Sequence, residues 1–188
     1  MKIILASASE RRIELLSRIV DDFSVIVSDF DEGTIKFNNS ISEYIEEIAL
    51  GKAKVVSEQV NDNSIIIAAD TVVSLDNKIL MKPKDRVDAF NTLKSLSGRT
   101  HKVYTSLVLI NNKNGKILKD TVSTEVKFSE LTESEITKYI ESDEPMDKAG
   151  SYGIQGRGGA FVEEIKGCYY SVVGLPLNRL RNMLLEII

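Results

Sequence analysis

The sequence predicts an α/β protein with a mixed β-sheet flanked by helices, and two observations carry this prediction. Short apolar runs of strand character alternate with longer segments whose apolar residues recur at helical spacing. Two long strand-like segments, residues 102–110 and 117–128, are joined by a short turn, so the sheet is not purely parallel. The length of 188 residues, of which 43% are hydrophobic, fits a single domain with two lobes over residues 1–188.

The first elements are a strand and a helix that follow each other directly. Residues 2–6 read as a short buried strand. Ser7 with Glu10 fits a capping box at the start of the helix, although Ser9 could cap instead. The predicted apolar face of this helix comprises Ile13, Leu16, Ile19 and Val20.

Capping residues predict four further helices. Ser40 and Thr132 are each followed three positions later by a glutamate, and the helix from Ser40 is expected to run to about residue 58. Asp85 opens a helix that Gly98 closes. Pro176 begins the last helix of the chain.

The remaining strands are predicted from apolar runs. Residues 65–69 form an apolar strand that ends on Asp70, residues 72–75 continue it, and a turn leads to a return strand over residues 78–81. Strands are also expected near residues 160–165 and 169–173, after a glycine-rich segment.

Composition excludes several classes of function. A formal net charge of −4 lacks the basic excess of a general nucleic-acid binder. Cys168 is the only cysteine, which rules out an intrachain disulfide and favours a reducing, cytoplasmic compartment. The apolar run after Met1 is too short for a signal peptide, and no stretch is long enough to span a membrane. His101 is the only histidine, so carboxylates must hold any metal, which favours Mg²⁺ or Mn²⁺.

Charged and polar residues mark four places where chemistry could sit. Residues 7–12 combine a helix N-terminus with two hydroxyls and two arginines, which suits a polyphosphate, although a capped surface helix would look the same. Asp70 is a carboxylate at the end of an apolar run, able to bind a metal or accept a proton from water, or simply to cap a turn. Lys52 and Lys82 could neutralise phosphates or be solvated. The glycines of residues 147–156 let backbone amides approach a ligand.

Two missing motifs restrict the mechanism. The sequence lacks GxxxxGK[ST], which excludes a P-loop. With His101 as the only histidine, no nucleophile triad is supported, so water must be the nucleophile.

Taken together, the segments closely resemble the Maf family of nucleotide pyrophosphatases, over nearly the whole chain and in the family's order. Each block is weak alone, but the blocks together are specific. The matching residues are 5–9 (LASAS), 11–12, 52–53, 69–73, 82–83, 96–101, 144–145, 147–150, 152–156 and 172–177.

The resemblance implies a two-lobed α/β fold with a mixed sheet and a central cleft, often as a homodimer. It also implies hydrolysis of a nucleoside triphosphate to the monophosphate and pyrophosphate with a divalent cation. Asp70 is then the proton acceptor and, with Glu32, a metal ligand, while Lys52 and Lys82 assist catalysis. The residues expected to hold the substrate are Ser9, Arg11, Arg12, Thr71, Lys148 and Gln155.

The family associates Arg12, Thr71 and Gln155 with base choice, and this trio resembles the branch that cleaves dTTP and UTP. A glutamine amide carries a donor and an acceptor, which can meet N3–H and O4 of uracil or thymine together. Cytosine reverses that pattern and would leave buried groups unpaired. Met81 and Asp143 stand where the family commonly has glycine, and they leave the proposed catalytic groups in place.

Three alternatives remain open at this point. The same reaction could act on modified or non-canonical nucleotides. A nucleotide-binding regulator of cell division would bind nucleotide tightly with little turnover. A structural α/β module would leave the acidic and basic loops without a role.

Overall fold

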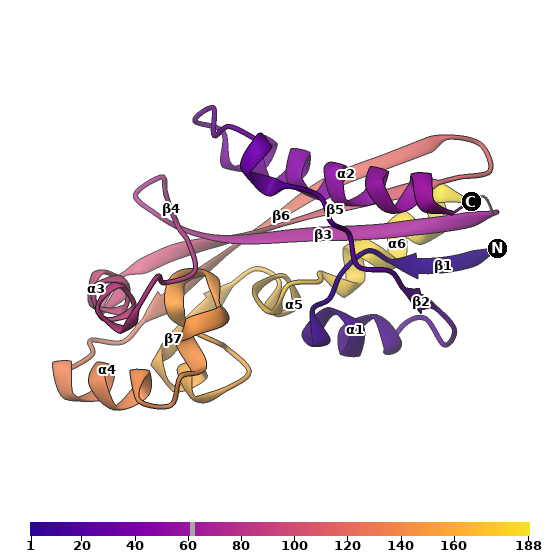
Figure 1. Ribbon diagram of the computed structural model, residues 1–188. Coiled ribbons are helices and arrows are strands. Elements are labelled where there is room, and N and C mark those ends of the chain that lie inside the picture. The colour runs from indigo at the N-terminus through magenta and orange to yellow at the C-terminus, as the bar shows by residue number, and fades with distance from the viewer. Residues whose placement is uncertain (61–62) are drawn as a thin grey trace. The chain divides into compact units, whose positions relative to one another are not determined.

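The computed structural model describes residues 1–60 and 63–188 and confirms the α/β class with a mixed sheet (Figure 1). Over these residues the strands form a seven-stranded sheet in the order β2-β1-β3-β5-β6-β7, with β4 paired to β3. The pairs β1–β2 and β1–β3 are parallel, whereas β3–β4 and β6–β7 are antiparallel. The strands are β1 (Lys2–Leu5), β2 (Ser24–Val25), β3 (Ser64–Leu75), β4 (Lys78–Leu80), β5 (Thr100–Asn111), β6 (Lys116–Phe128) and β7 (Val162–Lys166).

The helices begin largely where capping residues predict them. Ser40 accepts a hydrogen bond from the Glu43 amide, Asp85 accepts one from the Asp88 amide, and Thr132 forms a complete capping box. The α-helices are α1 (Glu10–Ser17), α2 (Ile41–Gln59), α3 (Arg86–Leu96), α4 (Glu133–Ile140), α5 (Tyr169–Val173) and α6 (Leu177–Ile187). The 3₁₀ helices are η1 (Glu32–Thr34), η2 (Glu144–Asp147), η3 (Ala149–Ser151) and η4 (Arg157–Phe161).

At the start of α1 the alternative cap is confirmed, whereas one expected strand was wrong. Ser9, offered as the alternative to Ser7, is the N-cap residue of α1, and the Ser7 hydroxyl accepts the Ser9 amide at 3.2 Å. The strand expected over residues 169–173 is helix α5. Gly167, with φ of 131°, ends β7, and Thr124 Oγ1 accepts the Cys168 amide at 2.9 Å, so the backbone turns away from the sheet before Tyr169.

The chain divides into two compact units. Unit 1 comprises residues 1–70, 105–122 and 174–188, and unit 2 comprises residues 71–104 and 123–173. Each unit has a hydrophobic core of its own. Among the described residues, no helix is both long enough and apolar enough to cross a membrane.

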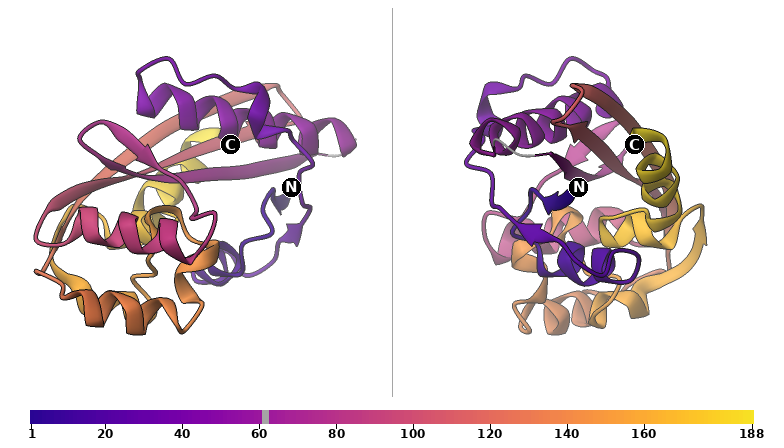
Figure 2. Two further views of the ribbon diagram at one scale, coloured as in Figure 1. Left: turned by 60° about the vertical axis from the view of Figure 1, so that its left-hand side comes forward. Right: turned by 90° about the vertical axis from the view of Figure 1, so that its right-hand side faces the viewer.

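Unit 1 is a sheet segment with helices on both faces, as Figure 2 shows. Alternate residues of β1, β3 and β5 pack against α2 on one face. The intervening residues, among them Leu5 and Ile67, are also fully buried, and α1 and α6 lie on that opposite face (Figure 1). The core residues of the α2 face are Ile4, Ala6, Ala49, Ala53, Val56, Ile66, Ala68, Val108 and Ile110.

Unit 2 is built around an aromatic core. Phe128 packs edge-to-face with His101, Tyr152 and Phe161, with ring centroids 4.8 to 6.0 Å apart. The ring of Tyr139 on α4 packs against Phe161 at 5.0 Å. The four aromatic side chains and His101 are all buried, so they anchor α4 and the glycine-rich segment to the sheet strands of unit 2.

Candidate active site

Strand register explains why Asp70 faces helix α2. In a strand, residues two apart share a face, so Asp70 lies on the same face as Ile66 and Ala68, which pack against α2. On α2, Lys52 is one turn from Ala49 and therefore points toward the same sheet face. Lys52 Nζ donates to Asp70 Oδ1 at 2.7 Å, and this contact links the two elements.

Glu32 joins the same ammonium group from a separate loop. Its Oε1 lies 2.7 Å from Lys52 Nζ, the same distance as the Asp70 oxygen. Glu32 is the first residue of η1, whose N-cap Asp31 accepts the Gly33 amide at 2.9 Å. The side chains of Lys52 and Asp70 are only 16% and 13% exposed, whereas that of Glu32 is 52% exposed. A lysine thus bridges one buried and one exposed carboxylate.

Asp70 has the environment of a carboxylate that can exchange a proton. Burial raises its pKa above the ordinary value, and this outweighs the lowering by the charges of Lys52 and Arg12. The negative charge of Glu32 raises it further. Perturbed carboxylates of this kind cluster at catalytic sites.

Arg12 is held in place by backbone and hydroxyl oxygens. Its Nε donates to the Gly174 carbonyl at 3.0 Å, and its Nη1 lies 3.5 Å from Ser7 Oγ. Burial lowers the pKa of Arg12, and the nearby charge of Asp70 raises it while that of Arg11 lowers it. The sequence did not single out Gly174 as a partner of Arg12, because a contact across 162 positions leaves no local signal.

The start of α1 adds hydrogen-bond donors to this group. Ser9 is the N-cap residue, and its side chain makes no cap hydrogen bond within the helix. The N-terminus of a helix carries the positive end of the helix dipole, and Arg11 and Arg12 lie in this first turn of α1. This end of α1 suits an anion.

Tyr44 is a further neighbour that sequence reasoning assigned only to an apolar helix face. Burial raises the pKa of its hydroxyl, and the charges of Asp70 and Glu32 raise it further. Its ring packs edge-to-face with Phe37 at 5.7 Å. Tyr44 lies about two helical turns before Lys52 on α2, so helical spacing with Lys52 was the signal that could have found it.

The other predicted site residues belong to unit 2. Thr71 directly follows Asp70 in β3, and Lys82 is exposed after β4. Gln155 is exposed within the glycine-rich segment. Lys148 Nζ donates to the Glu144 carbonyl at 2.8 Å and to Asp147 Oδ1 at 2.6 Å, so its ammonium is tied to its own segment.

Thus the structure brings together Arg12, Lys52, Asp70 and Glu32 in unit 1, with Arg11 and Ser9 alongside on α1. The roles of all the predicted site residues, in both units, stay predictions.

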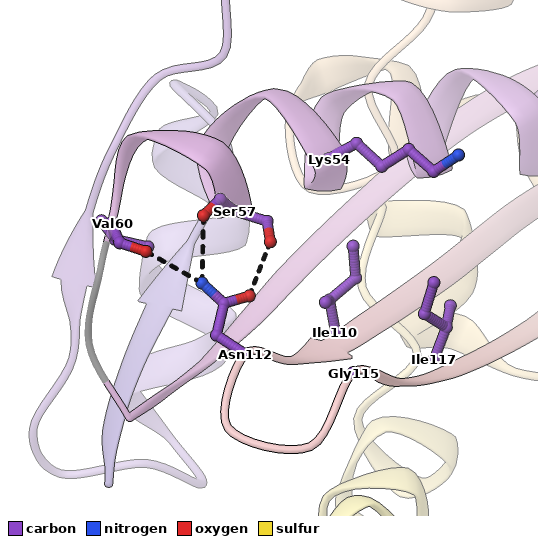
Figure 3. Close-up of a pocket in the computed structure, with 7 residues that line it drawn as sticks. All are labelled: Lys54, Ser57, Val60, Ile110, Asn112, Gly115 and Ile117. Carbon is purple, nitrogen blue, oxygen red and sulfur yellow. Dashed lines mark hydrogen bonds between the residues drawn. The ribbon is translucent and has the colours of Figure 1, made fainter.

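A separate pocket in unit 1 lies between the end of α2 and the β5–β6 turn (Figure 3). The side chain of Asn112, which lines this pocket, is already paired. Asn112 Nδ2 donates to the carbonyls of Ser57 and Val60 at 3.0 and 3.1 Å, and its Oδ1 accepts the Ser57 hydroxyl at 2.6 Å. Asn112 therefore satisfies carbonyls at the C-terminus of α2, which is a structural role.

Comparison with known proteins identifies the family to which the chain belongs. The family model described as Maf-like protein matches residues 2–187. The chain belongs to the Maf family. A dTTP/UTP pyrophosphatase of Clostridium botulinum strain Alaska E43 is 62% identical over 188 residues, with 100% of both chains covered. A dTTP/UTP pyrophosphatase of Clostridium beijerinckii is 58% identical over 187 residues, again with 100% of both chains covered.

Solved structures support the Maf fold assignment at the level of architecture. A HAM1 protein from Coxiella burnetii superposes with a TM-score of 0.55 at 16% identity, covering 99% of each chain. The Ham1 protein of Staphylococcus aureus gives a TM-score of 0.51 at 16% identity, covering 98% of each chain. At these identities the likeness concerns the fold alone.

Proposed function

We propose that this Maf protein is a nucleoside triphosphate pyrophosphatase that hydrolyses dTTP and UTP to the monophosphate and pyrophosphate. One observation carries the proposal: a buried carboxylate of raised pKa, Asp70, shares the ammonium of Lys52 with Glu32, beside Arg12. The names of relatives up to 62% identical over the full chain support the substrate class.

Each of these side chains has a chemical task in that reaction. Asp70 accepts a proton as water attacks the α phosphorus, and the bond between the α phosphorus and its bridging oxygen breaks. Pyrophosphate leaves with the bonding electron pair. Arg11 and Arg12, with Ser9 and the first-turn amides of α1, bind the phosphate oxygens. Lys52 holds Asp70 and Glu32 in one orientation.

Unit 2 supplies the remaining groups that we propose. Lys82 adds positive charge toward the phosphate chain, and Lys148 supports the glycine-rich segment. Thr71 and Gln155, together with Arg12, select the base. The single two-lobed domain, the cytoplasmic location inferred from the lone cysteine and the homodimer implied by the family resemblance stay predictions.

Asp70 and Glu32 are the side chains that we propose for a Mg²⁺ or Mn²⁺ ion. Both already face one positive charge, the Lys52 ammonium, at 2.7 Å. Mg²⁺ is usually bound by one or two carboxylates and completes its shell with substrate phosphates and water, so this donor pair fits. Over residues 1–60 and 63–188 no group of three or more metal-ligating side chains gathers. When bound, the metal would supply positive charge against the phosphate oxygens.

The test is pyrophosphate release from dTTP and UTP by the wild-type chain and by Asp70→Asn. Loss of the proton acceptor should lower kcat by about a thousandfold, within the range attributed to general base catalysis. Asp21→Asn, which changes an exposed carboxylate of the same unit, serves as the control and should keep wild-type turnover. Turnover by Asp70→Asn within about threefold of the wild-type value would refute Asp70 as the base.

A further inference from the structure

The loop of residues 153–158, which carries Gln155, is closed into a backbone ring by contacts between its own residues. Gly153 and Gly158 lie against each other: a Cβ added to Gly158 would be 3.0 Å from both the nitrogen and the oxygen of Gly153. The Gly156 amide donates to the Gly153 carbonyl at 3.2 Å. Gln155 is exposed between these closed ends. Its position is therefore set by whatever fixes the ends of the ring.

Glu144 and Tyr139 fix both ends. Glu144 Oε2 accepts the Arg157 amide at 2.9 Å, and Oε1 accepts the Gly158 amide at 3.2 Å. The Tyr139 hydroxyl donates to Glu144 Oε1 at 2.8 Å and accepts the Gly153 amide at 3.1 Å. A single carboxylate, extended by one hydroxyl, thus binds three amides of the ring.

The space beneath the ring is filled by the same carboxylate. A Cβ added to Gly156 would lie 2.5 to 2.6 Å from the carboxylate atoms of Glu144, so only glycine fits there. Burial raises the pKa of Glu144, but the hydrogen bonds from the Arg157 and Gly158 amides and the Tyr139 hydroxyl, with the charge of Lys148, together lower it below its ordinary value. Glu144 is therefore ionised at neutral pH and accepts hydrogen bonds through both oxygens.

Tyr139 anchors this arrangement to the core of unit 2. Its side chain is buried and its ring packs against Phe161. The hydroxyl is both a donor and an acceptor, because it donates to Glu144 and accepts from Gly153. These two hydrogen bonds attach the loop to helix α4, which carries Tyr139.

We propose that Glu144, acting with Tyr139, is a positioning residue that sets base selectivity by holding Gln155 in one place. The inference rests on the proposed function, in which Gln155 meets the base edge. An amide that is free to move could turn to suit either uracil or cytosine, since it carries both a donor and an acceptor. Discrimination between the two bases needs an amide whose position and orientation are fixed.

Two variants test this arrangement, and one serves as a control. Glu144→Gln keeps the side-chain shape but places an NH₂ group against a backbone N–H, so one amide of the ring loses its acceptor. Tyr139→Phe removes only the hydroxyl that bridges Gly153 and Glu144. Glu141→Gln removes an exposed carboxylate at the end of α4 and is the matched control.

The first measurement is amide hydrogen exchange, which needs no substrate. Exchange at whichever of the Arg157 and Gly158 amides loses its acceptor should accelerate at least about tenfold in Glu144→Gln, and exchange at Gly153 should accelerate in Tyr139→Phe. Glu141→Gln should match the wild type at all three amides. Unchanged exchange in both test variants would overturn the proposed attachment of the ring.

The second measurement is the affinity for the α,β-methylene analogues of UTP and CTP, which differ in the base edge and resist cleavage between the α and β phosphates. The wild type should prefer the UTP analogue, and Glu144→Gln should reduce the ratio of the two dissociation constants by about tenfold. A wild-type ratio in Glu144→Gln and Tyr139→Phe, or a wild type without preference, would overturn the inference. Failure of the proposed function is distinct: the wild type would bind the analogues but release no pyrophosphate from UTP.

Discussion

The ring of Phe30 lies directly over Gly51 in the middle of helix α2. A Cβ added to Gly51 would come within 2.6 Å of three ring atoms of Phe30. Phe30 stands two residues before Glu32, and Gly51 stands one residue before Lys52. The contact therefore attaches the loop that delivers Glu32 to the part of α2 that carries Lys52, and the Glu32–Lys52 ion pair at 2.7 Å lies beside it.

Gly51→Ala should destabilise the protein by about 1–3 kcal/mol, because the added methyl group must displace the Phe30 ring. A destabilising change would identify the contact with Phe30, since glycine-to-alanine changes inside a helix otherwise stabilise a protein by about 0.5–1 kcal/mol. Urea denaturation of the two proteins gives the difference in the free energy of unfolding. If Glu32 helps to hold the metal, the Mg²⁺ concentration for half-maximal pyrophosphate release should also rise.

The double variant separates the ring contact from other effects of the methyl group. With Phe30→Ala already in place, Gly51→Ala should become neutral or stabilising, because the space above α2 is then open. Destabilisation of the same size in both backgrounds would contradict the contact described here.

His101 gives the stability of unit 2 a predictable pH dependence. Its side chain is 2% exposed, and burial lowers its pKa from 6.5 to about 4. Because the folded state binds fewer protons than the unfolded state between these values, the contribution of neutral His101 is complete above pH 6.5 and is lost as the pH falls toward 4. Over that window the loss amounts to about 3 kcal/mol.

His101→Gln provides the comparison, because glutamine stays neutral and can still bond the Tyr152 hydroxyl, which lies 2.8 Å from His101 Nε2. The free energy of unfolding of each protein should be measured by denaturant titration at intervals from pH 7 to pH 4. The wild type should lose more stability than the variant, while the carboxylates common to both cancel in the difference. Parallel pH profiles would show that His101 titrates normally.

Local signals predicted much of the fold because they depend on neighbouring residues. The capping pairs at Ser40 and Thr132 placed helix starts correctly, and the apolar run around Asp70 placed the central strand. Helix α5 was missed because its short sequence, YYSVV, has strand-like composition. The backbone leaves the sheet before α5 because the Cys168 amide donates a hydrogen bond to Thr124 Oγ1, 44 positions away.

The candidate site could be predicted only as a set of residue types. Residue patterns singled out Asp70 and Lys52, and resemblance to the Maf family added Glu32. That the two carboxylates share one ammonium depends on the register of β3 against α2. The role of Glu144 had no sequence signal of its own. Its carboxylate binds amides 13 and 14 positions away, and a glutamate next to a proline does not reveal such partners.

Asp143 is a non-glycine residue with a positive φ angle. It adopts the left-handed conformation, with φ of 57° and ψ of 0°, between α4 and η2. That conformation is the one glycine adopts without strain, so a glycine at this position would follow the same backbone path. Arg86 Nη2 lies 2.8 Å from Asp143 Oδ1, but both side chains are more than 60% exposed, so this ion pair contributes little.

Asp143→Gly should therefore change the free energy of unfolding by no more than about 0.5 kcal/mol, because relief of the left-handed backbone offsets the greater freedom of glycine in the unfolded chain. Asp143→Val removes the same ion pair but places a β-branched residue at positive φ, and it should destabilise by about 1–2 kcal/mol. Denaturant titration of the three proteins side by side measures both differences. Equal stabilities of the glycine and valine variants would show that the left-handed conformation is not required at this position.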